Sequence, residues 1–82
     1  MVYMWQEEKK KPYYRFQTDD RKAMEKMKRR EKFKLAGKAC NCDLWIFTCQ
    51  FSRPDIAKKT LQTLAGGKVK YDKYEEIYYA GM

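Results

Sequence analysis

The chain has 82 residues, enough for one small domain, and its hydrophobic content of 44% allows a thin core. Nineteen Lys and Arg residues against eleven Asp and Glu residues give a net charge of +8, which favours a polyanionic partner. The chain has no His, the usual general base near neutral pH, and no P-loop, dinucleotide fingerprint or nucleophile–His set, so we expect neither enzymatic activity nor a cofactor.

The first eleven residues form a segment of their own. Four apolar residues (2–5) precede a charged run (7–11), and Pro12 separates this N-terminal arm (1–11) from the single α+β domain that we predict over residues 12–82. Two alternatives are open for the arm: a mobile segment, or an extra strand or flap docked through Trp5. We expect neither a secretory leader nor a membrane span, because no apolar run is long enough, and therefore a cytoplasmic protein.

Residues 13–17 alternate as a strand does, with Tyr14 and Phe16 facing inward and the odd-numbered side chains facing outward. Residues 18–20 then provide helix-capping side chains and early negative charge. Residues 20–32 contain no Gly, Pro or β-branched residue, which predicts a helix.

This predicted helix and the segment after it are strongly basic. Residues 21–38 contain nine basic and two acidic residues, a local balance of 9 − 2 = +7. Helical spacing places four of the cations on one face. They are Lys22, Lys26, Arg29 and Arg30.

Residues 33–38 alternate again, with Phe33 and Leu35 inward and Lys34, Ala36 and Lys38 outward. They are predicted to pair as a hairpin with residues 43–51, the most apolar run in the chain. In that run the odd-numbered side chains are assigned to the core. They are Trp45, Phe47, Cys49 and Phe51.

The C-terminal part begins with a helix-start signature in which Ser52 is the cap, Pro54 lies in the first turn and Asp55 supplies an acid. The helix continues to residue 65 and ends at Gly66. Two further segments have strand character: Val69 and Tyr71 start a strand or extension, and 77–79 form the final strand with Ile77 and Tyr79 inward.

The predicted order is strand, helix, strand, strand, helix, strand. This is the ferredoxin-like βαββαβ pattern, an antiparallel sheet with both helices on one face, with residues 13–17 and 43–51 in central strands. The alternative is an α+β domain of the same elements in which the N-terminal arm and the C-terminal Tyr segment extend or rearrange the sheet.

The charge pattern predicts a non-catalytic protein that contacts nucleic acid or a nucleoprotein complex. Cations neutralise phosphates, and tyrosine rings stack on unpaired bases. RNA-recognition domains bind through the open sheet face, but the Gly-rich consensus of that family is absent here. The predicted contacts are Lys22, Lys26, Arg29 and Arg30 on the helix, and Arg15, Lys34, Lys38 and the stacking residue Tyr13 on the sheet.

A protein partner is the alternative. An apolar patch on the open sheet face could be covered by homodimerisation or by another protein. Its residues would be Leu44, Ile46, Tyr13 and Tyr78. Such a chain would be an accessory or inhibitor factor, for example a virus-encoded one.

The three cysteines do not indicate a metal site. Structural zinc normally takes four Cys or His ligands, and this chain has Cys40, Cys42 and Cys49 and no His. We expect Cys49 to be buried and the other two to lie in an exposed turn, in a reducing intracellular setting.

Overall fold

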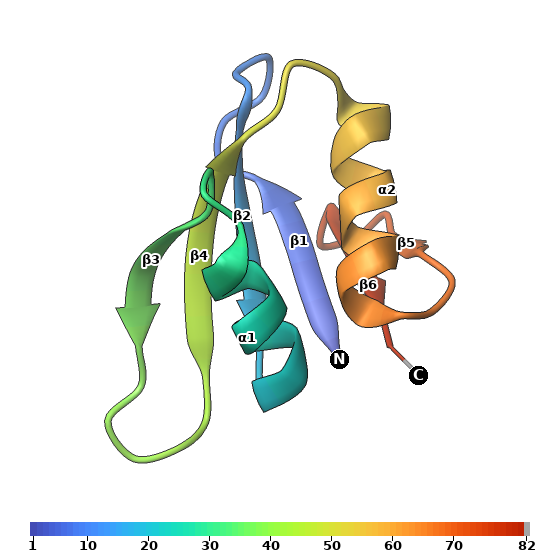
Figure 1. The fold of residues 1–82 in the computed structure, drawn as a ribbon. Helices are drawn as coiled ribbons and strands as arrows, with labels where there is room; N and C mark the ends of the chain where they lie inside the picture. Colours follow the sequence, from blue (N-terminus) through green and yellow to red (C-terminus); the bar gives the residue numbers. More distant parts are fainter. Residues whose placement is uncertain (82) are drawn as a thin grey trace.

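A computed structural model describes residues 1–81 and shows an α+β fold with a six-stranded antiparallel sheet and two helices (Figure 1). The strands lie in the order β3-β4-β2-β1-β6-β5. The elements are β1 (Val2–Gln6), β2 (Tyr13–Thr18), α1 (Arg21–Arg29), β3 (Lys34–Lys38), β4 (Trp45–Gln50), α2 (Pro54–Ala65), β5 (Lys70–Asp72) and β6 (Ile77–Ala80).

Both helices cover the same face of the sheet (Figure 1). α1 packs against β2, and α2 packs against β1 and β6. We call the other side the open face, since no helix covers it. The sheet therefore separates two surfaces, one formed by the helices and one by strand side chains.

The simple ferredoxin-like prediction is wrong in strand number and order. In that fold the final strand pairs with the first strand of the βαββαβ unit, which is β2 here. In this chain β1 occupies that position and pairs with both β2 and β6. Residues 2–6 thus form an extra strand, because Val2 and Met4 alternate correctly and both are buried beneath the helices. Trp5, the expected docking residue, is half-buried on the open face.

The two strands predicted to be central have neighbours on both sides, as expected. β2 lies between β1 and β4, and β4 lies between β2 and β3. In β4 the side chains of Trp45, Phe47 and Cys49 are only 3–5% exposed, which confirms the alternation assigned from the sequence. Phe16 of β2 is fully buried and packs 4.9 Å from the ring of Phe33.

Thr18 is the buried polar residue of this core, and its hydrogen bonds connect three elements. Its Oγ1 donates to the carbonyl oxygen of Met1 (3.1 Å) and accepts from the backbone N–H of Asp20 (3.0 Å). Burial of the hydroxyl is tolerated because both bonds are made. The start of β1, the end of β2 and the start of α1 are thereby held together.

The facing predicted for the last strand is wrong. Tyr78 and Ala80 point toward the helices, and Lys58 of α2 lies over the Tyr78 ring at 4.9 Å. Tyr79 instead pairs with Tyr3 on the open face, with ring centroids 6.3 Å apart. The pairing of β6 with β1 sets this register, and the sequence pattern of β6 alone does not reveal it.

The facing predicted for Lys38 is also wrong. The pairing of β3 with β4 shifts between Leu35 and Gly37, a β-bulge. One extra residue moves every later side chain to the other face, so Lys38 pairs with Trp45 on the helix side of the sheet. Its Nζ lies 5.9 Å from the centre of the Trp45 ring.

The helix boundaries differ slightly from those predicted. α1 is shorter than residues 20–32, and Arg30 is its extended C-cap residue. At α2 the N-cap residue is Arg53, without a side-chain cap bond, so the predicted role of Ser52 is wrong. Pro54 does open α2, and Gly66 adopts the expected left-handed conformation (φ 70°) at its end.

Candidate nucleic-acid interface

α1 places most of its surface in solvent. Ala23 and Met27 are the buried residues of the helix, and Met24 packs half-buried against the core, so the apolar stripe is narrow and the other positions face outward. The Asp20 carboxylate accepts a hydrogen bond from the backbone N–H of Lys22 (3.0 Å) and caps the helix start. Three cations in the last turn lie near the negative end of the helix dipole, where positive charge is favourable.

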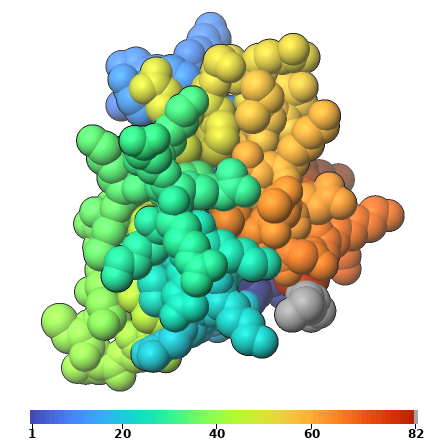
Figure 2. Space-filling view, viewed as in Figure 1, coloured from blue at the N-terminus to red at the C-terminus, as the bar shows by residue number. Residues whose placement is uncertain are grey.

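The segment 21–32 forms an exposed ridge of positive charge. It carries seven basic and two acidic residues, a balance of 7 − 2 = +5, and all seven cations are exposed. Among the described residues, one of the seven makes an ion pair: Arg21 lies 4.0 Å from Asp43. Figure 2 shows this segment, coloured cyan to green, along the front of the molecule beside α2.

Four of the predicted contacts come together on this ridge. Lys22, Lys26 and Arg29 are spaced i, i+4 and i+7 and share one side of α1. Arg30 follows at the C-cap and is also exposed. We call these four residues the α1 basic face.

The other predicted contacts lie elsewhere. Arg15 and Lys34 both pair with Thr48 of β4 in register, so they flank it on the open face. Arg15 donates a hydrogen bond to Glu7 (2.8 Å), and that bond raises the pKa of its guanidinium. Tyr13 is 49% exposed at the start of β2, opposite Gln50. A straight nucleic acid cannot contact this group and the α1 basic face together, because the sheet lies between them.

A basic hollow beside α1 was missed from the sequence. It has a volume of about 430 Å³, and Arg21, Lys28 and Lys38 line it together with Met24 and Trp45. The bulge in β3 brings Lys38 into this group. Gly37 within a strand pattern is the available signal, since an isolated strand glycine often marks a bulge.

Two ionisable groups of the core have raised pKa values. Burial raises the pKa of the Tyr14 hydroxyl and of the Cys49 thiol. Both groups belong to the core, and loss of hydration on burial is the largest cause of both shifts. Within residues 1–81, no three His, Cys, Asp or Glu side chains gather closely enough to hold a metal ion.

The described helices are also too short or too polar to cross a membrane. In comparisons with known proteins, no family model, no curated protein and no solved structure matches this chain.

Proposed function

We propose that this protein is a non-catalytic binding protein whose α1 basic face contacts the phosphate backbone of nucleic acid, free or within a nucleoprotein complex. The observation that carries the proposal is the density of exposed cations on segment 21–32, nearly all of which lack a carboxylate partner in the described chain. Binding of a polyanion to unpaired like charges is favourable, because it relieves their mutual repulsion and releases counterions from the nucleic acid.

The geometry favours backbone contact over base recognition. α1 is a short, exposed helix whose outward side chains are long, flexible cations, and these contact phosphates without reading sequence. The basic hollow formed by Arg21, Lys28 and Lys38 extends the positive surface toward β3. Binding is therefore expected to depend strongly on salt and weakly on sequence.

The test is the double variant Arg29→Glu/Arg30→Glu, titrated with labelled single- and double-stranded oligonucleotides at low and moderate salt. The logarithm of the binding constant falls with the logarithm of salt concentration, with a slope of about −0.9 for each phosphate contact on B-DNA. Loss of two contacts should therefore make the slope less steep by about 2. We expect weaker binding to every oligonucleotide sequence, with the fold checked by circular dichroism.

The matched control is Lys68→Glu/Lys70→Glu, just before and at the start of β5. This edge strand is separated by β1 and β6 from β2, against which α1 packs. Both double variants change the net charge from +8 to 8 − 4 = +4. The control should keep most of the wild-type salt slope, since only local contacts release counterions. Absence of binding by the wild-type protein at low salt contradicts the proposal, and equal losses in the two variants contradict the assignment to α1.

A further inference from the structure

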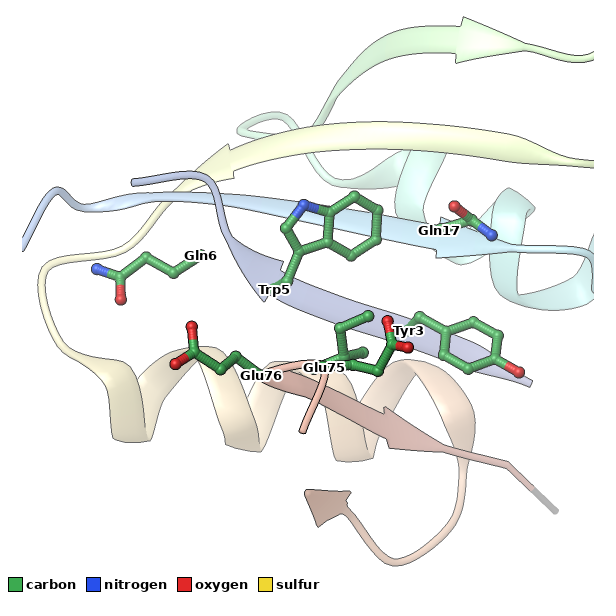
Figure 3. A pocket seen from close by; sticks show the side chains of 7 residues that line it. Tyr3, Trp5, Gln6, Gln17, Glu75 and Glu76 are labelled. Atoms are coloured by element: carbon green, nitrogen blue, oxygen red, sulfur yellow. The ribbon is translucent and has the colours of Figure 1, made fainter. Parts of the chain in front are cut away.

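The open face carries a groove of opposite character between β1 and β6. One hollow, of about 370 Å³, is lined by Tyr3, Trp5 and Ile77 with the carboxylates of Glu75 and Glu76 (Figure 3). A second hollow of about 370 Å³ shares Tyr3, Glu75 and Ile77 with the first. The two therefore form one continuous depression, which we call the β1–β6 groove. Asp72 and Tyr79 extend its wall.

The groove is acidic in a basic protein. Neither hollow has a Lys or Arg in its lining, although the chain carries +8 overall. Met1 also lines the second hollow, and its terminal ammonium pairs with Asp19 at 3.4 Å. Glu75 makes no ion pair within the described chain. Glu76 pairs with Lys9 at 3.4 Å, but the two side chains are 58% and 82% exposed, so a competing cation can replace Lys9.

The turn that presents these carboxylates is well defined. Asp72 Oδ1 accepts hydrogen bonds from the backbone N–H groups of Tyr74 (2.9 Å) and Glu75 (3.3 Å). Glu76 has a positive φ of 56°, a left-handed conformation that Gly adopts more readily than Glu. A carboxylate thus occupies a turn position that Gly would adopt at lower cost.

Aromatic faces next to exposed carboxylates attract cations by two mechanisms. The ring quadrupoles of Trp5 and Tyr3 stabilise a cation above their faces, and Glu75 adds direct charge attraction. The same carboxylates repel phosphate, so the groove disfavours nucleic acid. Two adjoining hollows suit two cationic side chains, and in an extended segment alternate side chains lie about 7 Å apart on one side.

We propose that the β1–β6 groove binds an extended basic segment of a partner protein, with Lys or Arg side chains at alternate positions in the two hollows. The inference concerns the face opposite α1 and does not depend on nucleic-acid binding.

The probe is a blocked pentapeptide with Lys at its second and fourth positions, compared with versions carrying Gln or Glu there. Titration is followed by the NMR signals of the two indole N–H groups. Trp5 lines the groove, whereas Trp45 is buried on the helix side, so the Trp5 signal should shift and the Trp45 signal should not. Only the Lys peptide should shift the Trp5 signal.

Two variants test the carboxylates. Glu75→Gln should weaken peptide binding about two- to fivefold, the effect expected for one exposed charge pair. Glu76→Gly should also weaken binding while leaving the melting temperature unchanged or raised, because Gly relieves the positive φ. Glu31→Gln, the same charge change on the helix side, should bind like wild type. None of these variants should reduce oligonucleotide binding.

Three results would overturn the inference. The first is equal binding of the Lys, Gln and Glu peptides. The second is an unmoved Trp5 signal at saturation. The third is self-association of the free protein that Glu75→Gln abolishes, since this would assign the groove to a second copy of the chain.

Discussion

Cys49 differs from the other two cysteines in its surroundings. It is 5% exposed on the helix side of β4, and burial raises the pKa of its thiol, which disfavours the reactive thiolate. Cys40 and Cys42 are exposed and free, between β3 and β4. The three thiols therefore separate into a packing residue and two accessible ones, as the sequence indicated.

This separation predicts the labelling pattern. At neutral pH, brief treatment with iodoacetamide should add two labels to the native protein and three after denaturation, counted by mass spectrometry. Labelling of Cys49 should become faster at higher pH only to the extent that its thiol ionises or that the fold opens and exposes it. A Cys49→Ala variant should take two labels in both states. Rapid labelling of Cys49 in the native protein would show that it is not buried.

At the scale of elements, β1 decides the shape of the sheet. It bridges β2 and β6, and Met4 at its centre is fully buried opposite Phe16 and Tyr78. The N-terminal residues are therefore part of the core. A chain lacking them would expose the edges of both β2 and β6.

Met4→Ala should lower the free energy of unfolding by about 2–5 kcal/mol, the usual cost of truncating a fully buried Met to Ala. Met24→Ala is the matched control, because Met24 is only half-buried at the side of α1 and Ala favours helix. Denaturant unfolding followed by circular dichroism measures both. If Met4→Ala loses no more unfolding free energy than Met24→Ala, β1 contributes little to the core.

Elements with strong local signals could be predicted from the sequence. The alternation of β2 and β4, the Asp20 cap and the Gly66 end of α2 all appear in the structure as expected. These features depend on a few neighbouring residues, so composition and spacing reveal them.

Features that depend on distant pairing could not be predicted. Insertion of β1 beside β2 and the facing of β6 both follow from strand partners far away in the chain. The Lys38 reversal follows from a single bulge. The α1 basic face could be identified because helical spacing alone defines it, whereas the β1–β6 groove requires two segments about 70 positions apart to meet.

At the scale of the whole molecule, the densest positive charge lies on the helix side of the sheet, whereas the open side carries both an acidic groove and the cations Arg15, Lys34 and Lys70. Segment 21–32 concentrates cations on the helix side, and Glu75 and Glu76 line the open side. The two proposed binding surfaces therefore lie on opposite sides of the sheet and do not overlap. The division also means that repulsion among cations acts mainly within one part of the fold.

Salt should therefore stabilise the free protein. Between about 0.01 M and about 0.15 M NaCl the screening length falls from about 30 Å to about 8 Å, which weakens repulsion across the α1 region. The ion pairs that salt also weakens are largely exposed and contribute little. We expect the melting temperature to rise with salt for the wild type and to rise less for Arg29→Glu/Arg30→Glu.

The control is Lys68→Glu/Lys70→Glu, which has the same net charge but an intact α1 basic face. Its melting temperature should retain most of the wild-type response to salt. A melting temperature that falls with salt, or an equal response in the two variants, would mean that the cations of 21–32 do not repel one another appreciably in the free protein.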